Sequence, residues 1–371
     1  MTLWQSLQGA LPLQYIRALM AEGHIHGAKD DYLQPSSLDL SLSGEVYRMR
    51  GTMLPRRGET IRSLVDSGML YRCDLQHPLE LFGIYLVRLN ETLSLPDAVH
   101  AYTNNKSSSG RINLQTRLLV DGVSRFDMVP AGYRGELWLE IIPKSFPVKL
   151  DAGERINQMR FATCDARLND TDHFRLVDQA QLLCDLNGNA YRADSATVDK
   201  DGVVMSVDLT SEDIVGYSSS PTACRVLDFA KRDYDPAEFF EPIRRPKNGQ
   251  FTMKRGDFYI LVTKECLRVP DNYAAEMAAY DPSKGEFRSH YAGFFDPGFG
   301  YGPQGAMRGT PGVLEIFTHD NDFVLRDGQP ICKMIYERLA APAELLYGDA
   351  KLASNYYRQR GPRLSKHFKM S

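Results

Sequence analysis

Two stretches of the sequence repeat the same short motifs in the same order. The first contains Leu95-Pro96-Asp97 and then Leu139-Glu140, and the second contains Val269-Pro270-Asp271 and then Leu314-Glu315. The Pro-Asp pairs lie 174 residues apart (96 to 270), and the Leu-Glu pairs lie 175 apart (140 to 315). Solenoid repeats have periods of about 20–50 residues, so a repeat this long predicts two similar domains.

The length and composition agree with two soluble domains. The 371 residues suffice for two cores, and 43% apolar and 25% charged residues are ordinary for globular proteins. A net charge of −3 disfavours a nucleic-acid polymer as a partner. No apolar run reaches about 18 residues, so we expect no membrane span.

The N-terminal residues and the cysteines indicate a cytoplasmic protein. The start, Met1-Thr2-Leu3-Trp4, lacks the basic and apolar regions of a signal peptide. The six cysteines are scattered and form no Cys-x-x-Cys pair, which favours free thiols in a reducing compartment.

Short alternating or apolar runs dominate the chain and predict a mainly β fold, either barrel or sandwich. Apolar spacing predicts one short helix at 12–23, ending at a glycine. The polar segment 165–182 marks a domain boundary, which gives domains 1–168 and 169–371. We expect 225–250 to be a loop-rich insertion with one helical turn.

A polar loop in the first copy has the composition of a phosphate site. Lys106, Ser107, Ser108 and Arg111 place hydroxyls and cations close together, and such groups bind phosphate oxygens. The alternative is an ordinary surface loop. The spacing excludes a Walker loop, because no Gly-Lys-Ser or Gly-Lys-Thr follows the required glycine.

Glu140 occupies an apolar strand segment, which is unfavourable for a charge. Alternation places Glu136, Trp138 and Glu140 on one face of the strand. Glu140 is then either an outward-facing carboxylate or a partly buried general acid and base with a raised pKa. Glu315 follows a similar apolar run in the second copy and is the corresponding candidate.

Two aspartates and two possible cofactor motifs complete the candidates. Asp127 and Asp296 precede glycine-containing turns, so each is either a turn former or a ligand-binding residue. His24-x-His26 lacks a third ligand nearby, and neither His-x-Glu nor Pro-Cys-x-x-Cys occurs, so we expect no zinc. The glycine-rich segment 298–305 opens no helical pattern, which disfavours a dinucleotide fingerprint.

Taken in order, these segments resemble the dCTP deaminase branch of the trimeric dUTPase superfamily, and most closely a long bacterial subfamily with tandem domains. The matching segments are 33–40, 95–97, the loop 106–111, the Asp127 turn with Glu140, the Asp296 turn with Glu315, and the tail at 359–362. The resemblance covers most of the chain. It implies two tandem dUTPase-like β-barrel domains, each a distorted jelly roll, with a few short helices.

The resemblance also implies an activity, the hydrolytic deamination of dCTP to dUTP and ammonia without a metal at the base. Glu140 would act as general base and then acid, with Glu315 as the second-copy candidate. Magnesium would bind through the triphosphate, and no zinc would take part. The implied substrate contacts are Lys106, Ser107, Ser108, Arg111, Asp127, Trp138, Asp296, Tyr356, Gln359 and Arg360.

The two copies differ at the phosphate loop. The first has Lys106 where the family usually has Arg, and the second has Asp281 and Glu286 in the corresponding segment, where they would repel a triphosphate. We therefore expect the first copy to be catalytic. The resemblance implies a homo-oligomer, a trimer or a multiple of one, and the site lies either among first domains alone or between the two domains of a chain.

Two alternative functions stay open at this point. One is a dUTP diphosphohydrolase or a bifunctional enzyme, which would use the turn aspartate to activate water at the α-phosphate. The other is a non-catalytic nucleotide-binding protein on the same barrel.

Overall fold

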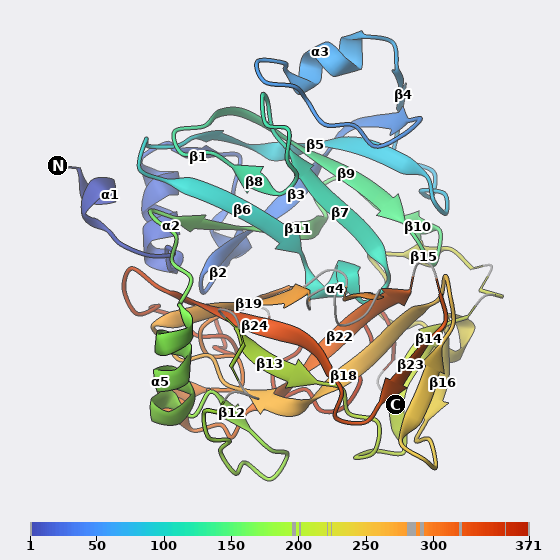
Figure 1. Ribbon diagram of the computed structural model, residues 1–371. Coiled ribbons are helices and arrows are strands. Elements are labelled where there is room, and N and C mark those ends of the chain that lie inside the picture. Colours follow the sequence, from blue (N-terminus) through green and yellow to red (C-terminus); the bar gives the residue numbers. More distant parts are fainter. Residues whose placement is uncertain are drawn as a thin grey trace. The chain divides into compact units, whose positions relative to one another are not determined.

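The chain forms two compact units that do not follow the order of the sequence throughout. The computed structural model describes residues 2–194, 198–199, 202–220, 222–223, 225–279, 287–289, 293–318, 321–352 and 354–369 (Figure 1). Unit 1 comprises Met1–Asp165, Cys224–Tyr234 and His367–Ser371, and unit 2 comprises Ala166–Ala223 and Asp235–Lys366. The sequence-based boundary after residue 168 lies near the first junction, but the sequence did not predict that the two short later segments belong to unit 1.

Unit 1 is built on one large antiparallel sheet, with a separate two-stranded pair. The strand order of its main path is β7-β9-β5-β3-β11-β6-β8. Its strands are β1 (Ile25–His26), β2 (Leu33–Gln34), β3 (Ser37–Met49), β4 (Leu70–Cys73), β5 (Ile84–Ser94), β6 (His100–Asn105), β7 (Leu114–Leu119), β8 (Met128–Val129), β9 (Arg134–Pro143), β10 (Val148–Lys149), β11 (Arg155–Ala162) and β15 (Leu227–Asp228). Its helices are α1 (Leu3–Ser6), α2 (Leu13–Ala21), α3 (Ile61–Asp66), α4 (Ser107–Gly110) and the 3-10 turn η1 (Asp30–Tyr32).

Unit 2 divides its strands among smaller sheets. Two of them have the orders β16-β14-β18-β22-β20 and β13-β24-β19-β21. The strands are β12 (Leu183–Cys184), β13 (Val203–Ser206), β14 (Ile214–Ser219), β16 (Phe240–Arg244), β17 (Gln250–Met253), β18 (Phe258–Leu267), β19 (Tyr273–Ala279), β20 (Phe287–Ser289), β21 (Phe294–Phe295), β22 (Thr310–Thr318), β23 (Phe323–Arg326) and β24 (Pro330–Arg338). Its helices are α5 (Asp170–Ala180) and the 3-10 turns η2 (Pro236–Glu238) and η4 (Pro303–Gly305).

The mainly β prediction is confirmed, and so is the helix expected at 12–23. The structure adds a helix at the predicted domain boundary and corrects one local prediction. The polar segment 165–182 contains α5, an amphipathic helix capped by Asn169, whose side chain accepts a hydrogen bond from the Asp172 N–H. The segment 225–250 contains the predicted helical turn, η2, but it also contains β16, which pairs with β14.

The strand registers of the two units are equivalent, which confirms the duplication. In unit 1, Leu86 of β5 lies opposite Glu140 of β9, and in unit 2, Ile260 of β18 lies opposite Glu315 of β22. A second pair of strands agrees. Thr103 of β6 lies opposite Met159 of β11, and Met277 of β19 lies opposite Met334 of β24.

A buried serine–glutamate pair also occurs in both units. The Glu91 carboxylate accepts hydrogen bonds from the Ser41 backbone N–H at 2.9 Å and its hydroxyl at 2.6 Å. The Glu265 carboxylate accepts the same two bonds from Ser206, at 2.7 and 2.5 Å. Burial raises the pKa of both glutamates, and the serine donors oppose that effect. The pair joins β3 to β5 within one sheet in unit 1, and it joins β13 to β18 of two different sheets in unit 2.

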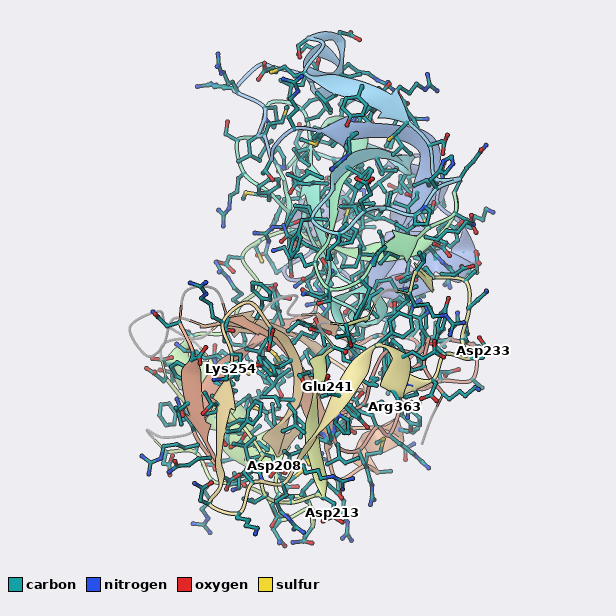
Figure 2. The ribbon with its side chains drawn as sticks, turned by 90° about the vertical axis from the view of Figure 1, so that its right-hand side faces the viewer. Asp208, Asp213, Asp233, Glu241, Lys254 and Arg363 are labelled. Carbon is teal, nitrogen blue, oxygen red and sulfur yellow. The ribbon has the colours of Figure 1, made fainter. Side chains whose placement is uncertain are left out.

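Charged side chains cover the outer surface of unit 2. Asp213 and Lys254 are both exposed there (Figure 2). Asp213 pairs with Arg245 at 2.6 Å, and Lys254 pairs with Asp322 at 2.8 Å. Water screens exposed pairs of this kind, so they add little, and the stability of unit 2 comes mainly from its apolar core.

Phe368 tests the assignment of the C-terminal segment to unit 1. Its side chain is 5% exposed, and its ring lies 6.4 Å from that of Tyr234 between centroids. Phe368→Ala should lower the free energy of unfolding of unit 1 by about 3 kcal/mol, the usual cost of a buried Phe→Ala change. Differential scanning calorimetry of the full chain should show the unit 1 transition moving to lower temperature.

Phe174→Ala is the control, because Phe174 lies on α5 of unit 2 and is 37% exposed. That variant should shift neither transition by more than a degree or two. An unchanged unit 1 transition in Phe368→Ala would contradict the assignment.

Candidate functional site

Glu140 is the most strongly buried acidic candidate in unit 1. It lies on β9, between β7 and β5, opposite Arg117 on one side and Leu86 on the other. The residue is 1% exposed, and neither carboxylate oxygen has a partner within hydrogen-bonding geometry among the described residues. The interpretation as a buried acid and base therefore agrees with the structure better than an outward-facing carboxylate does.

The surroundings of Glu140 favour its protonated form. Burial is the main cause and raises the pKa of the carboxyl above its usual 4.5. The Arg117 guanidinium opposes this effect, as does the Thr52 hydroxyl, whose approach to the carboxylate does not meet hydrogen-bond geometry, and the negative charge of Asp127 reinforces it. Such a group changes its protonation state more readily near neutral pH than an exposed glutamate does.

Asp127 is held in place beside this strand by three donors. Its carboxylate accepts hydrogen bonds from the Leu118 N–H at 2.8 Å, the Arg117 guanidinium at 2.8 Å and the Thr103 hydroxyl at 3.2 Å. Asp127 has φ +60°, the left-handed conformation that Asp tolerates better than most residues. Burial raises its pKa, while Arg117 and the Leu118 N–H lower it.

Arg117 is a site residue that the sequence did not predict. Its guanidinium bonds Asp127 and its charge also acts on Glu140, so one cation serves two carboxylates. Alternation along β7 places Arg117 on an exposed position between the buried Thr116 and Leu118. A cation within a short strand that is followed by a turn aspartate was the sequence signal for it.

The predicted phosphate loop forms a single helical turn, α4. Ser107 is half-buried, whereas Ser108 and Arg111 are 2% and 4% exposed. The Asn105 side chain that precedes the loop accepts hydrogen bonds from the N–H and the hydroxyl of Thr116, at 3.1 and 2.7 Å. These bonds attach the loop to β7, the strand that also carries Arg117.

Lys106 forms an ion pair that the sequence did not predict. Its ammonium group contacts the carboxylate of Asp39, a residue of β3 that is 2% exposed. Asp39 stands between two leucines in the sequence, and a charge in such a position was the available signal. The equivalent position in unit 2 is Val204, since Gln158 lies opposite Asp39 and Lys333 lies opposite Val204.

Trp138 lies two residues before Glu140 and is fully buried. Its ring packs 6.1 Å from that of Tyr47 between centroids, and the Arg62 guanidinium lies 4.8 Å above it. Arg62 also bonds Glu45 and Glu136, so an ionic cluster covers this face of β9. Trp138 therefore packs as a core residue, and its predicted contact with a ligand stays a prediction.

The unit 2 candidates retain the carboxylates of this arrangement. Glu315 is 6% exposed at the position equivalent to Glu140, and Asp296 is 7% exposed. Asp281 and Glu286, the predicted repelling residues of the second copy, lie outside the described residues.

The predicted tail contacts all belong to unit 2. Tyr356 is 6% exposed, and Gln359 is 2% exposed, with its amide donating a hydrogen bond to the Pro311 carbonyl at 3.0 Å. Arg360 follows as an exposed cation. The tail is thus fixed to the first residues of β22.

The described residues were also searched for metal ligands and membrane helices. They include no group of three His, Cys, Asp or Glu side chains that could hold a metal ion. None of the helices in the described ranges is long and apolar enough to cross a membrane.

Two family models match the chain in succession. Residues 7–165 match the 2′-deoxycytidine 5′-triphosphate deaminase N-terminal domain, and residues 174–368 match the C-terminal domain of the same family. Together they account for both copies of the repeat.

Individual relatives agree with the family models. A protein of Methanobrevibacter smithii named "dCTP deaminase, dUMP-forming" is 30% identical over 139 residues, 37% of this chain and 67% of that protein. A protein of the same name from Methanosphaera stadtmanae is 26% identical over 205 residues, 54% of this chain and 93% of that protein. The crystal structure of 2′-deoxycytidine 5′-triphosphate deaminase from Agrobacterium tumefaciens superposes with a TM-score of 0.83 at 36% identity, covering 91% of this chain and 100% of that one.

The burial of Glu140 predicts a pH-dependent stability difference. Replacement by Gln should stabilise the fold at neutral pH relative to the wild type, because the amide stays neutral whereas the buried carboxyl is ionised at a cost. Because the pKa of Glu140 is raised in the folded state, the wild type loses stability as pH rises from about 4.5 through the folded pKa. Urea unfolding between pH 4.5 and 8 should show the difference growing over that window and then staying constant.

Glu80→Gln is the matched control, since its side chain is 75% exposed. It should show no comparable change with pH. A Glu140→Gln effect that is the same at every pH would contradict the raised pKa.

Proposed function

Because the chain belongs to the 2′-deoxycytidine 5′-triphosphate deaminase family, we propose that it deaminates dCTP at the site of unit 1, with Glu140 as the catalytic residue. The observation that carries this proposal is the carboxylate of Glu140, buried on β9 without a hydrogen-bond partner among the described residues. A carboxylate in this state has spare acceptor capacity for a water molecule and for the substrate.

The proposed reaction adds water to C4 of the cytosine ring and expels the amino group. The water oxygen bonds to C4, while Glu140 takes one water proton and passes it on. One proton of the water ends on ring N3 and the other on the departing nitrogen, so the C4–N bond breaks and ammonia leaves. The products are dUTP and ammonia, and Glu140 returns to its starting state.

The electrostatics of unit 1 support a group that serves as base and then as acid. Burial raises the pKa of Glu140, which makes its protonated form accessible near neutral pH. Arg117 limits this rise and holds Asp127 next to the strand. Asp127, whose carboxylate is fixed by three donors, is the proposed sugar contact that the family resemblance implies.

The triphosphate contacts are proposed for the α4 turn. Lys106, Ser107, Ser108 and Arg111 supply two cations and two hydroxyls, the groups that bind phosphate oxygens. Lys106 would have to share its charge between Asp39 and the phosphate. Magnesium would enter with the substrate, held mainly by the triphosphate oxygens.

The remaining substrate contacts, the oligomeric state and the location are proposed from the sequence alone. Trp138, Asp296 and the tail residues Tyr356, Gln359 and Arg360 stay predicted substrate contacts. A homo-oligomer, a trimer or a multiple of one, and a cytoplasmic location also stay predictions.

A second candidate product is favoured by the relatives. The proteins of M. smithii and M. stadtmanae are named dUMP-forming, which implies removal of pyrophosphate as well as ammonia. In this chain, Asp127 of the turn is the carboxylate that would act as the base in the step that releases pyrophosphate. The alternative of a non-catalytic nucleotide-binding protein loses support, because the family is one of enzymes.

Matched glutamine variants separate the two strand carboxylates. Glu140→Gln should lower kcat on dCTP by about 10²–10⁴-fold, since a positioned acid-base group contributes that much. Glu315→Gln is the control, because it changes the residue at the equivalent register position of unit 2. Ammonia release under single-turnover conditions is the measurement. Full activity in Glu140→Gln, or loss only in Glu315→Gln, would place the catalyst elsewhere.

A product assay distinguishes the two outcomes of dCTP turnover. With magnesium and the folded full chain, we expect one dUTP and one ammonia per dCTP, with no pyrophosphate. dCTP, dUTP and CTP are incubated side by side, and nucleotides, ammonia and pyrophosphate are quantified. Stoichiometric dUMP and pyrophosphate would establish the bifunctional alternative, and pyrophosphate from dUTP without ammonia from dCTP would establish a diphosphohydrolase.

A further inference from the structure

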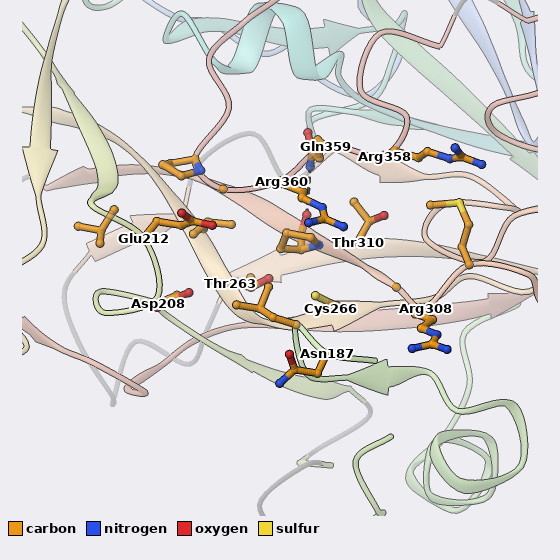
Figure 3. Close-up of a pocket in the computed structure, with 18 of the residues that line it drawn as sticks. Asn187, Asp208, Glu212, Thr263, Cys266, Arg308, Thr310, Arg358, Gln359 and Arg360 are labelled. Atoms are coloured by element: carbon orange, nitrogen blue, oxygen red, sulfur yellow. Dashed lines mark hydrogen bonds between the residues drawn. The ribbon is translucent and has the colours of Figure 1, made fainter. Parts of the chain in front are cut away.

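Unit 2 contains a cavity that is lined by none of the unit 1 residues proposed for deamination. Its volume is about 590 Å³, within the range of small-molecule sites in proteins. It is bordered by β18, by the start of β22, by residues 306–309 that precede β22, and by the tail residues 358–362 (Figure 3). Glu315 is not among the residues that line it.

At register positions beside the cavity, unit 2 has smaller side chains than unit 1. In unit 1, Arg88 of β5 lies opposite Trp138 of β9. In unit 2, the equivalent positions hold Val262 and Val313. The change from an arginine and a tryptophan to two valines removes most of the side-chain volume at this place in the fold.

The neighbouring register position also has an uncharged pair in unit 2 where unit 1 has a charged residue. Thr92 lies opposite Glu136 in unit 1, and Cys266 lies opposite Pro311 in unit 2. In unit 1, Glu136 takes part in the ionic cluster with Arg62 that covers Trp138. Unit 2 has lost this charge from the strand, and Cys266 and Pro311 instead line the open cavity.

Three arginines line the cavity: Arg308 and Arg358 lie on one side, and Arg360 lies nearer the middle (Figure 3). Within the described part of the chain, no carboxylate lies within ion-pairing distance of any of the three guanidinium groups. A phosphate group would satisfy such guanidiniums through paired hydrogen bonds.

Two of these arginines have side chains that are positioned by neighbours. A Cβ at Gly188, which has φ +85°, would come within 2.6 Å of the Arg308 side chain, so only glycine allows this close packing. The Arg358 guanidinium lies 5.3 Å from the centre of the Tyr357 ring. Packing of this kind limits how far the two guanidiniums can move before a ligand binds.

The other side of the cavity is acidic. Asp208 and Glu212 lie together there, away from Arg308 and Arg358 (Figure 3). The Asp208 carboxylate accepts hydrogen bonds from the N–H groups of Thr210 and Ser211, both at 3.0 Å, through a single oxygen. Its second oxygen and the exposed Glu212 carboxylate are acceptors for N–H or O–H donors of a ligand.

Uncharged residues separate the two charged sides. Ile214, Val215 and Val262 supply apolar surface, and Thr310 supplies a hydroxyl. A matching ligand has an anionic end, a compact middle and an end with hydrogen-bond donors. Nucleoside phosphates have this constitution, with the phosphates at one end and base N–H groups at the other.

We propose that the cavity of unit 2 is a second nucleotide site, which binds a nucleoside phosphate with its phosphates on Arg308, Arg358 and Arg360 and its base toward Asp208 and Glu212. The site binds without deaminating, because its lining includes no counterpart of Glu140. It goes beyond the proposed function and shares none of the unit 1 residues, although it assigns Arg360, also a predicted contact of the dCTP site, to this cavity.

Arg308 is the residue to test, because it lies outside both the tail and the unit 1 site and its side chain is exposed. The experiment uses the full chain with Glu140→Gln, so that dCTP is bound but turned over slowly. Equilibrium dialysis and calorimetry measure the number of sites per chain for dCTP, dUTP and dUMP, with inorganic tripolyphosphate as the probe for a simple anion site.

We expect two nucleotide sites per chain in the Glu140→Gln background. Adding Arg308→Gln should weaken one of them by about 10–100-fold, as expected for loss of a charge-assisted contact, and Arg308→Lys should weaken it less. The control is Arg326→Gln, an exposed arginine of β23 in the same unit that does not line the cavity. It should keep both sites.

Three results would overturn the proposal. They are a single site per chain with every nucleotide, an Arg308→Gln variant that binds like Arg326→Gln, and tripolyphosphate that binds as tightly as the nucleotides. The single variant Arg308→Gln, which keeps the catalytic Glu140, should deaminate dCTP at the wild-type rate. Failure of the deamination proposal can therefore be told apart from failure of the second-site proposal, because the number of binding sites is measured independently of turnover.

Discussion

The burial of one carboxylate between two strands is the constraint on which the unit 1 site depends. Glu140 is 1% exposed on β9, which pairs with β5 and β7, so its carboxylate is held away from bulk solvent. Burial raises the pKa of the carboxyl, and Arg117 limits the rise while it holds Asp127 in place. Burial on β9 destabilises the ionised carboxylate of Glu140, and the same burial gives Glu140 a pKa suited to proton transfer. Stability is thus lowered where function requires it.

The duplication shows how one set of strand registers can support different sites. Glu140 and Glu315 occupy equivalent positions, and the Ser41–Glu91 and Ser206–Glu265 pairs join equivalent strands. Side chains on the same framework have nevertheless diverged. Where unit 1 packs Trp138 beneath an ionic cluster, unit 2 has Val313 and an open cavity bordered by arginines. Backbone pairing has been retained, while side-chain volume and charge have changed the chemistry of each copy.

Several site features followed from the sequence because they depend on local spacing. Alternation placed Trp138 and Glu140 on one face of a strand, and clustering of hydroxyls and cations identified the turn at Lys106 to Arg111. The sequence did not predict Arg117 and Asp39, because each acts through a partner distant in the chain. Arg117 on β7 bonds Asp127 in the turn that follows this strand. Asp39 on β3 pairs with Lys106, which follows β6. Nor did the sequence predict the cavity, since its walls come from five separate segments.

The sequence by itself determined the repeat, the mainly β architecture and the family, because motif order and the two-residue period are properties of the linear chain. Tertiary structure decided which chain segments form each unit, as the inclusion of 224–234 and 367–371 in unit 1 shows. It also decided that Glu140 is buried without a partner among the described residues, whereas an isolated strand pattern allowed an exposed carboxylate equally well. The physical reason is that burial and pKa depend on the neighbours that other strands bring, and a linear pattern does not specify those neighbours.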